Sequence, residues 1–354
     1  MDRKKKLLRW IGIGVISLFV LFSVAAFVAI KINFDDIFAR TVEKELTASL
    51  RYEDVKDQYE RELFSFASGE NTLQGYLYGA ENTKGLVVFS HGIGGGAENY
   101  FSEGLYFVDH GYQVFAYDNT GCYQSEGKNS IGLPQSVVDL DAALDFIEGE
   151  ERFSGLPVYL WGHSWGAYAV TSIFNYEGHE IAASVSVAGF NDPATMVLEW
   201  CRDMMGKPLT FLLRPYLYIY QTIGFGEVFG YTAVGGINNT DTPVLLIHGD
   251  ADTTILTDGA ATVAYLDEIT NPNVEHVIWT KEGQNGHSNL FYSDDAIAYL
   301  DALNVEHRAL YQKYNEEIPY EVDKEFYDKI DKAKVSGLDE ELMGMILEFY
   351  ERNR

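Results

Sequence analysis

The chain has 354 residues, of which 47% are hydrophobic and 14% aromatic, so it is long and apolar enough for one large folded domain with additional segments. Its formal net charge of −27 excludes nucleic acid as an expected partner, because nucleic-acid binding needs clustered Lys and Arg. Cys122 and Cys201 are too few for a disulfide scaffold, although one bridge between them stays open. Neither these cysteines nor the scattered histidines show metal-ligand spacing, so we expect no metal and no cofactor.

Residues 1–31 are expected to form a cytoplasmic basic tip and a transmembrane anchor. Five basic residues lie between Arg3 and Arg9, and residues 10–30 then run without a charge. As a helix, this uncharged run spans about 31 Å, the thickness of the hydrocarbon core of a bilayer. A cleaved signal peptide is the alternative, but its apolar region normally has only about 7–15 residues. The basic cluster before the span predicts a single-pass protein of the cell membrane, with its N-terminus in the cytoplasm and the following domain outside.

Residues 32–60 alternate polar and apolar side chains at helical spacing, which predicts a juxtamembrane helical stalk. Short β-rich runs then alternate with helical patterns such as 136–148. This alternation predicts an α/β domain over 61–318, with a mostly parallel eight-stranded sheet and helices on both faces. The strand candidates are 62–68, 72–79, 85–90, 112–118, 158–163, 183–189, 243–248 and 275–280. No helical pattern separates the first two candidates, so we expect that edge of the sheet to be antiparallel.

A glycine-rich loop follows the third strand candidate. Residues 91–96 read H-G-I-G-G-G, and such a loop lets backbone N–H groups approach a substrate carbonyl closely. We expect the N–H of Ile93 to be one donor of an oxyanion hole, with the N–H of Gly94 as the alternative.

Residues 162–166 read G-H-S-W-G, a G-x-S-x-G motif at the end of a strand candidate and before a helical pattern. The glycines permit a sharp turn in which Ser164 takes a strained backbone conformation and presents its hydroxyl to a cleft. We therefore expect Ser164 to be a nucleophile and the N–H of Trp165 to be the other oxyanion donor. His91 and His163 lie in these motifs and are expected to support the site rather than to react.

Residues 190–242 interrupt the alternation of strands and helices with a long segment rich in large apolar side chains. They are predicted to form a helical lid over the site, and an apolar lid suits an acyl chain or another hydrophobic group. Most of these side chains are expected only to pack the lid onto the body of the domain.

A serine hydroxyl is a weak nucleophile that needs a base, and the base needs an orienting acid. Residues 248–252 read H-G-D-A-D directly after a strand candidate, and the loop after the last strand candidate contains His287. His287 is the expected base and Asp252 the expected acid, with Asp250 and Asp192 as competitors for the role of the acid.

Residues 319–354 are expected to form an acidic helical appendix at the C-terminus. Apolar residues recur there at helical spacing after Ser336 and Gly337, which predict a break before the last helix. Docking of this helix onto the body is favoured, and a partner-binding helix is the alternative.

The motifs at 91–95, 162–166, 248–252 and 286–287 together resemble those of the α/β-hydrolase family. Within it, they are similar to motifs of bacterial serine hydrolases related to monoacylglycerol lipases, lysophospholipases and serine aminopeptidases. The order Ser164, Asp252, His287 is the order of α/β-hydrolases. The family's spacing favours Asp252 over Asp250 as the acid.

This resemblance implies a serine hydrolase that cleaves carboxylic esters of the acylglycerol or lysophospholipid type through an acyl-enzyme. The substrate would be a small-molecule or lipid ester, and the N-terminal helix would attach the enzyme to the membrane. A serine aminopeptidase is the first alternative, for which Glu199 and Asp203 are candidates to bind the free amino group. The second alternative is a non-catalytic binding protein with a hydrolase fold.

Overall fold

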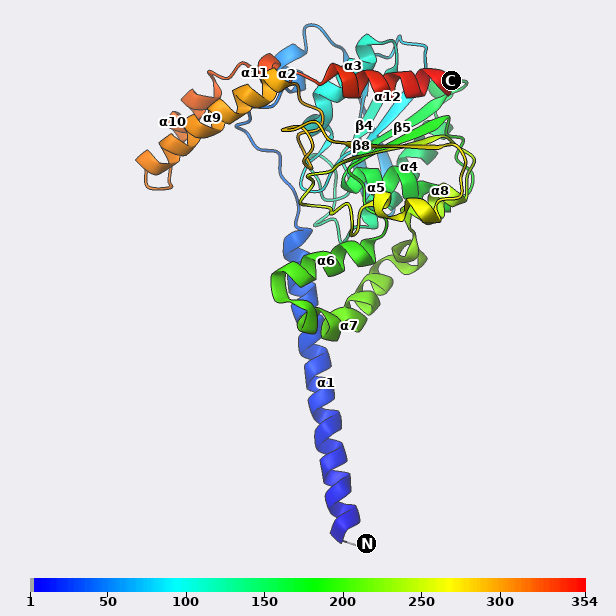
Figure 1. Cartoon of the computed structure of the whole chain (residues 1–354), viewed down its shortest axis with the longest axis vertical. Helices are drawn as coiled ribbons and strands as arrows, with labels where there is room; N and C mark the ends of the chain where they lie inside the picture. The colour runs from blue at the N-terminus through cyan, green and yellow to red at the C-terminus, as the bar shows by residue number, and fades with distance from the viewer. Residues whose placement is uncertain (1–2) are drawn as a thin grey trace.

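Figure 1 shows the computed structural model of the chain, which describes residues 3–354. An eight-stranded sheet lies at its centre, in the strand order β1-β2-β4-β3-β5-β6-β7-β8. The strands are β1 (Arg61–Ser68), β2 (Asn71–Tyr78), β3 (Leu86–Ser90), β4 (Gln113–Tyr117), β5 (Val158–His163), β6 (Ala183–Val187), β7 (Val244–Gly249) and β8 (Val274–Trp279). The helices are α1 (Arg3–Ile37), α2 (Tyr52–Val55), α3 (Phe101–Asp109), α4 (Gln135–Gly149), α5 (Trp165–Ser172), α6 (Pro193–Met205), α7 (Lys207–Phe225), α8 (Ala233–Asn238), α9 (Asp294–Lys313), α10 (Tyr320–Tyr327), α11 (Lys332–Val335) and α12 (Glu340–Arg352). The eight expected strands are confirmed.

The sheet is antiparallel at one edge and parallel elsewhere. β2 pairs with both β1 and β4 in antiparallel register, whereas the neighbours from β4 through β3 to β8 pair in parallel. This arrangement confirms the expected antiparallel edge, because β1 and β2 are joined by a tight turn that cannot carry a parallel crossover. The parallel strands all end at the same edge of the sheet, so the loops that follow β3, β5, β7 and β8 lie near one another.

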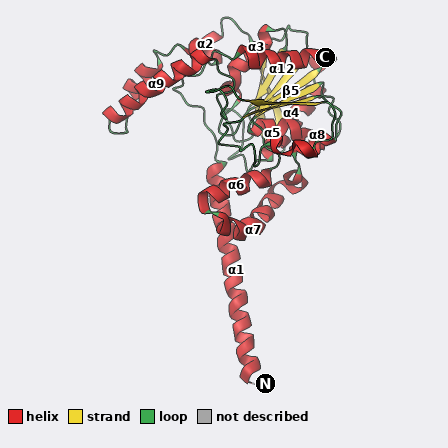
Figure 2. Cartoon of the chain, viewed as in Figure 1, coloured by secondary structure: helices red, strands yellow, loops and turns green. Residues whose placement is uncertain are grey.

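Helices cover both faces of the sheet (Figures 1 and 2), as parallel strands that are apolar on both sides require. α3 and α12 lie on one face, and α4, α5 and α8 lie on the other. Each face has its own apolar core, with Phe349 and Trp161 in the first and Leu140 and Leu160 in the second.

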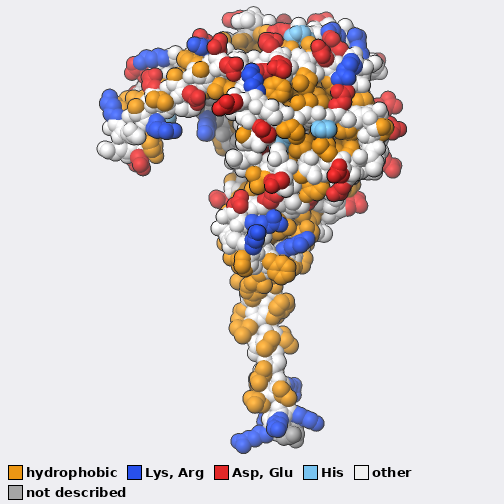
Figure 3. Space-filling view, viewed as in Figure 1, with side chains coloured by type: hydrophobic (Ala, Val, Ile, Leu, Met, Phe, Trp, Pro, Cys, Tyr) orange, Lys and Arg blue, Asp and Glu red, His pale blue; other side chains and the backbone are white. Residues whose placement is uncertain are grey.

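The N-terminal helix α1 leaves the folded body as a long apolar shaft (Figures 1 and 3). It is a candidate transmembrane span, long and apolar enough to cross a bilayer. Most of its side chains face outward, with Leu18 69% exposed, so most of α1 is not a core helix. The end nearest the body packs against α7, where the hydroxyls of Ser23 and Tyr216 lie 2.9 Å apart.

The segment after α1 differs from the expected helical stalk. α1 ends at Ile37, and of residues 38–60 only α2 is α-helical. Phe38 is 1% exposed, and the Arg40 guanidinium donates hydrogen bonds of 2.6, 2.8 and 2.9 Å to backbone carbonyls of the 123–127 loop. These contacts with a distant part of the chain fix a non-helical path along the body, which the local spacing of apolar residues could not reveal.

The predicted lid region between β6 and β7 consists of α6, α7 and α8. α6 and α7 form a helical hairpin that lies beside α1 and away from the sheet, whereas α8 packs on the body next to α5 (Figure 1). We call α6 and α7 the cap hairpin.

The C-terminal region divides into two parts rather than forming one appendix. α12 buries Leu342, Ile346 and Phe349 against the sheet, and the Tyr350 hydroxyl donates to the carbonyl oxygen of Leu160 at 2.7 Å. α10 and α11 instead lie with α9 in an arm that extends from the body (Figure 1). α12 is therefore an integral layer of the sheet.

Substitution of Phe349 tests this assignment of α12. Phe349→Ala should lower the free energy of unfolding by about 3–5 kcal/mol, because it leaves a cavity between α12 and the sheet. Chemical denaturation of the full chain in detergent, followed by tryptophan fluorescence, measures this loss. Val305→Ala on the exposed face of α9 is the control and should change stability by less than about 0.5 kcal/mol. A Phe349→Ala variant as stable as this control would contradict the assignment.

Candidate active site

Ser164 lies in the sharp turn that joins β5 to α5. Its backbone has φ 56° and ψ −113°, a conformation that residues other than glycine rarely adopt. A Cβ on Gly166 would lie 1.9 Å from the carbonyl oxygen of Ser90, and a Cβ on Gly162 would lie 2.3 Å from the carbonyl oxygen of Gly166. Only glycine fits at these two positions, so they allow α5 to start directly against β3 and β5.

The two expected partners of Ser164 lie beside it. His287 Nε2 is 2.9 Å from Ser164 Oγ, and His287 Nδ1 is 2.7 Å from Asp252 Oδ2. Because an ionised carboxylate can only accept, Nδ1 carries the imidazole proton and Nε2 is free to accept the proton of the serine hydroxyl. The structure thus brings together three residues from the connections that follow β5, β7 and β8.

Asp252 is buried, and both of its oxygens have partners. Oδ1 accepts from the backbone N–H groups of Thr254 and Ile255 at 2.8 and 2.9 Å, and Oδ2 lies 3.2 Å from His248 Nε2. Burial alone would raise the pKa of Asp252, but hydrogen bonds from His248 and His287 outweigh it and hold that pKa well below its usual range. Asp252 is therefore ionised at neutral pH and can stabilise a charged imidazole at His287.

The two competing acids have other partners. Asp250 is exposed and accepts from the side-chain amide of Asn285 at 2.5 Å. Asp192 caps α6 by accepting from the backbone N–H of Thr195 at 2.8 Å. Of the three acids, Asp252 is the one bonded to His287.

The loop after β3, residues 91–96, presents a free backbone donor, and we call it the oxyanion loop. His91 Nδ1 lies 2.8 Å from the carbonyl oxygen of Gly92, and His91 Nε2 accepts from the N–H of Asn119 at 2.9 Å. Burial lowers the pKa of His91 to about 4, so this ring is neutral with its proton on Nδ1. A trans peptide points its C=O and N–H in opposite directions, so the bond to Gly92 turns the N–H of Ile93 away from His91. Within residues 3–354, this N–H has no hydrogen-bond acceptor.

The N–H of Trp165 is a second free donor. Trp165 is the first residue of α5, where backbone N–H groups lack partners within the helix and the helix dipole favours negative charge. Its N–H has no acceptor in the described part of the chain. Gly94, the alternative donor, is exposed and has φ +76°.

A network of hydrogen bonds joins three loops of the site, and no pattern in the sequence points to its central residue, Tyr100. The Tyr100 hydroxyl accepts from the N–H of Gly92 at 3.1 Å and lies 2.7 Å from His163 Nδ1. His163 Nε2 lies 2.8 Å from the carbonyl oxygen of His287, which fixes the ring proton on Nε2 and makes Tyr100 the donor to Nδ1. Burial lowers the pKa of His163 to about 3, so the ring stays neutral. His163 and Tyr100 therefore connect the oxyanion loop to the loop that carries His287.

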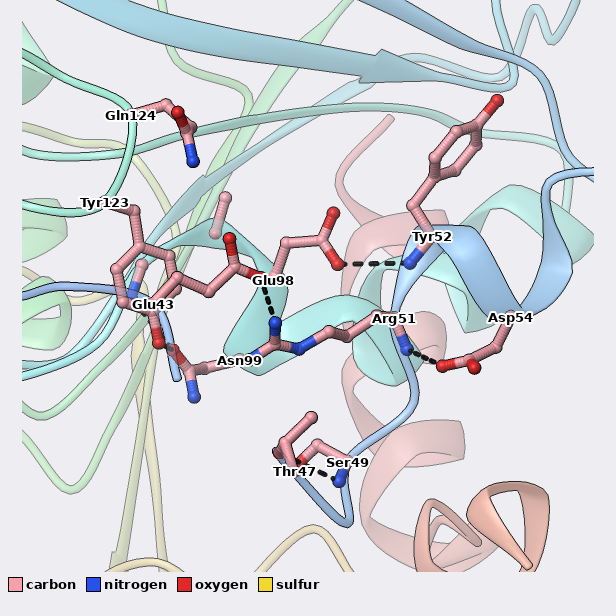
Figure 4. Close-up of polar contacts among 12 residues, drawn as sticks. Glu43, Thr47, Ser49, Arg51, Tyr52, Asp54, Glu98, Asn99, Tyr123 and Gln124 are labelled. Carbon is pink, nitrogen blue, oxygen red and sulfur yellow. Dashed lines mark hydrogen bonds and ion pairs between the residues drawn. The ribbon is translucent and has the colours of Figure 1, made fainter. Parts of the chain in front are cut away.

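The segment after α1 holds the other end of the oxyanion loop (Figure 4). Glu98 lies in the short helix η1 (Ala97–Tyr100) directly after that loop and accepts from the backbone N–H of Tyr52 at 3.1 Å. Arg51 pairs with Glu43 in the same cluster. Burial raises the pKa of Glu98, and its bond to Tyr52 works against that rise. The segment between α1 and β1 is thus attached to the turn that ends the oxyanion loop.

A group of possible metal ligands lies elsewhere on the body. Within residues 3–354, Asp145, Glu148 and His179 form the one set of such groups that comes together. His179 bonds at 2.9 Å to Asp141 and at 2.9 Å to Glu148, and these bonds raise the pKa of His179 to about 9. A protonated imidazole has no lone pair for a metal. Cys122 and Cys201 are both free thiols.

Comparison with known sequences shows similarity over part of the chain. The family described as "Serine aminopeptidase, S33" matches residues 81–221. Human monoglyceride lipase is 30% identical over 114 residues, which are 32% of this chain and 38% of the lipase. This match therefore spans well under half of the lipase.

Solved structures with a similar fold cover most of the chain at low identity. An alpha-beta hydrolase from Vibrio vulnificus superposes with a TM-score of 0.55 at 16% identity, over 73% of this chain and 87% of that one. The Pyrococcus furiosus esterase Pf2001 superposes with a TM-score of 0.52 at 17% identity, over 77% of this chain and 95% of that one. At this identity the likeness shows the fold.

Removal of the Tyr100 hydroxyl tests the network of hydrogen bonds. Tyr100→Phe leaves Gly92 N–H and His163 Nδ1 without their shared partner, so we expect the free energy of unfolding to fall by about 1–3 kcal/mol. Thermal unfolding of the full chain measures this change. Tyr106→Phe, on the neighbouring helix α3, makes the same chemical change as a control. Equal stability of the two variants would mean that the network does not hold the loops together.

Proposed function

Since this chain belongs to the α/β-hydrolase family, as its motifs predicted, we propose that it is a membrane-anchored serine hydrolase that cleaves carboxylic esters. The observation that carries this proposal is the hydrogen-bonded series Ser164, His287 and Asp252. A hydroxyl, an imidazole and a carboxylate in this contact can activate the serine as a nucleophile.

The proposed reaction proceeds through an acyl-enzyme. Ser164 Oγ attacks the carbonyl carbon of the ester while His287 Nε2 takes the hydroxyl proton, and the charged imidazole is stabilised by Asp252. The negative oxygen of the tetrahedral intermediate accepts from the N–H groups of Ile93 and Trp165, each worth roughly 2.7–4 kcal/mol. His287 then protonates the leaving alcohol. In the second half, His287 takes a proton from water, which attacks the acyl group and releases the acid.

Three observations support a lipid ester as the substrate. The matched human protein is named a monoglyceride lipase. The cap hairpin is rich in large apolar side chains, which suit an acyl chain. The apolar helix α1 would hold the enzyme at a lipid surface, where such esters are concentrated.

The charges at the two ends of α1 support one orientation in the membrane. Arg3, Arg9 and the three lysines between them precede the uncharged run, whereas Asp35 and Asp36 follow it. The positive-inside rule then places the N-terminus in the cytoplasm and the hydrolase domain outside.

A serine aminopeptidase is the second candidate, favoured by the description of the matching family. Such an enzyme needs a carboxylate for the free amino group of a peptide. Glu199 lies against Gly259, and burial raises its pKa, whereas Asp203 is exposed. The same serine and histidine would act on either substrate.

Hydrolysis assays distinguish these candidates. The full chain in detergent micelles is given p-nitrophenyl esters of increasing acyl length and, in parallel, aminoacyl p-nitroanilides. Ester turnover that peaks at medium or long acyl chains, and that falls by roughly 10⁶-fold in Ser164→Ala, is the expected result. Ser154→Ala, at an exposed turn, is the matched control and should keep full activity.

Other outcomes of this assay change the assignment in defined ways. Turnover of the anilides alone would replace the esterase with an aminopeptidase. Turnover that survives Ser164→Ala would remove the proposed nucleophile. An absence of serine-dependent turnover on both substrate types would contradict both enzymes and favour a binding protein.

Asp252→Asn tests the role of the acid. The amide cannot stabilise the charged imidazole and favours the wrong tautomer of His287, so kcat should fall by about 10⁴-fold. Asp250→Asn removes the same negative charge two residues earlier in the chain and should leave kcat within about threefold of the wild type. The steady-state rate on the preferred ester measures both, and equal losses in the two variants would contradict the assignment.

A further inference from the structure

The cap hairpin exposes an apolar surface, and such a surface is unfavourable in contact with water. Phe211 and Ile223 of α7 are 79% and 78% exposed, and Leu212 and Ile219 are about half exposed, at 49% and 48%. Leu212, Ile219 and Ile223 are spaced by seven and four residues, so they lie on one face of α7. Contiguous exposed apolar side chains of this kind mark a contact with another apolar phase.

Contacts with α1 place this surface at a definite height along the candidate transmembrane span. The Tyr216 hydroxyl lies 2.9 Å from Ser23, and its ring packs edge-on against Phe22 and Phe27. Ser23 lies seven residues before Ile30, the last residue of the uncharged run, which is about 10 Å along a helix. A bilayer that covers the uncharged run therefore also covers part of α7 to a depth of about 10 Å, the depth typical of interfacial helices.

The charge of the cap hairpin also differs from that of the rest of the domain. The chain has 53 acidic and 26 basic residues, whereas the cap hairpin contains the three basic residues Arg202, Lys207 and Arg214 and only two acidic ones, Glu199 and Asp203. Figure 3 shows a group of basic side chains on the folded part directly above the apolar shaft, whereas acidic side chains spread over the body.

Three basic side chains of the cap hairpin share one groove. Arg202 of α6 and Lys207 and Arg214 of α7 line a shallow groove together with Leu198, Thr210 and Phe211. None of the three forms an ion pair within residues 3–354. Lys207 and Arg214 lie on the side of α7 opposite Leu212, Ile219 and Ile223. When that apolar face enters the bilayer, the long cationic side chains can extend to the headgroup region and bind phosphate there.

We propose that the cap hairpin is embedded in the outer leaflet of the membrane that α1 crosses, with Arg202, Lys207 and Arg214 holding phospholipid phosphates. The partner is the bilayer itself, and lipids with a net negative headgroup are preferred. This proposal rests on the proposed anchor, because the height of the hairpin is set by its contacts with α1. It adds a lipid-binding surface that is separate from the reacting groups at Ser164.

The depth of the hairpin can be measured with fluorescent labels on the full chain. Cys201→Ala removes the more accessible thiol, and Cys122 is 1% exposed. Single cysteines then replace Leu18, Phe211, Ile223 or Val305, all 69–79% exposed, and carry an environment-sensitive dye. The labelled chains are reconstituted into phosphatidylcholine vesicles that contain a minority of phosphatidylglycerol, with or without brominated acyl chains.

We expect bromine to quench the labels at 18, 211 and 223 by about twofold or more and to leave the label at 305 unchanged. Quenching at 18 without quenching at 211 and 223 overturns the embedded hairpin and leaves the anchor intact. An unquenched label at 18 overturns the anchor, and with it the proposal. The two failures are therefore distinguishable.

The basic groove is tested at position 211, which lines it. Two vesicle preparations are compared, in which either the phosphatidylglycerol or an equal mole fraction of the phosphatidylcholine carries bromine. The label at 211 should be quenched several-fold more by the brominated phosphatidylglycerol. The R202Q/K207Q/R214Q variant should lose this enrichment. K324Q/K329Q/K332Q removes the same charge from the arm and should retain it. Equal quenching by both lipids, or an enrichment that survives in the groove variant, overturns the basic groove as a phosphate site.

Discussion

The site depends on one backbone contact, the approach of Gly166 to the carbonyl group of Ser90. A Cβ at Gly166 would lie 1.9 Å from that oxygen, so the contact exists only because glycine has none. It brings the start of α5 against the end of β3, and Ser164, between the two motif glycines, takes φ 56° in consequence. The oxyanion loop begins at the residue after Ser90. The same contact therefore sets the distance between the serine and the loop that would bind its intermediate.

Two neutral histidines fix the orientation of backbone groups around the site. His91 fixes the peptide that carries the N–H of Ile93, and His163 fixes the carbonyl group of His287. Burial lowers the pKa of His91 to about 4 and that of His163 to about 3. Both rings therefore keep one tautomer at neutral pH, and the loops stay in place while His287 gains and loses its proton during the proposed reaction.

The sequence predicted the parts of the molecule that local patterns encode. Strand alternation and the four motifs identified the eight strands and the residues that the structure brings together at Ser164, His287 and Asp252. Tyr100 could not be found in this way, because it lies outside every motif. It acts through a contact with His163, which is 63 residues further along the chain. The path of residues 38–51 was missed for the same reason. Its helical spacing is real, but tertiary bonds from Arg40 override it.

The N-terminal helix packs against the hydrolase domain and is not joined to it by a flexible linker. α1 packs against α7 of the cap hairpin, and Phe38, just beyond its end, is buried in the same core as residues of the body. The chain then continues to Tyr52, whose backbone bonds to Glu98 at the end of the oxyanion loop. A flexible linker would let the domain rotate freely above a membrane. Contacts at both the cap hairpin and the oxyanion loop instead give α1 one orientation relative to Ser164. A membrane that holds α1 therefore also fixes how the site faces its surface.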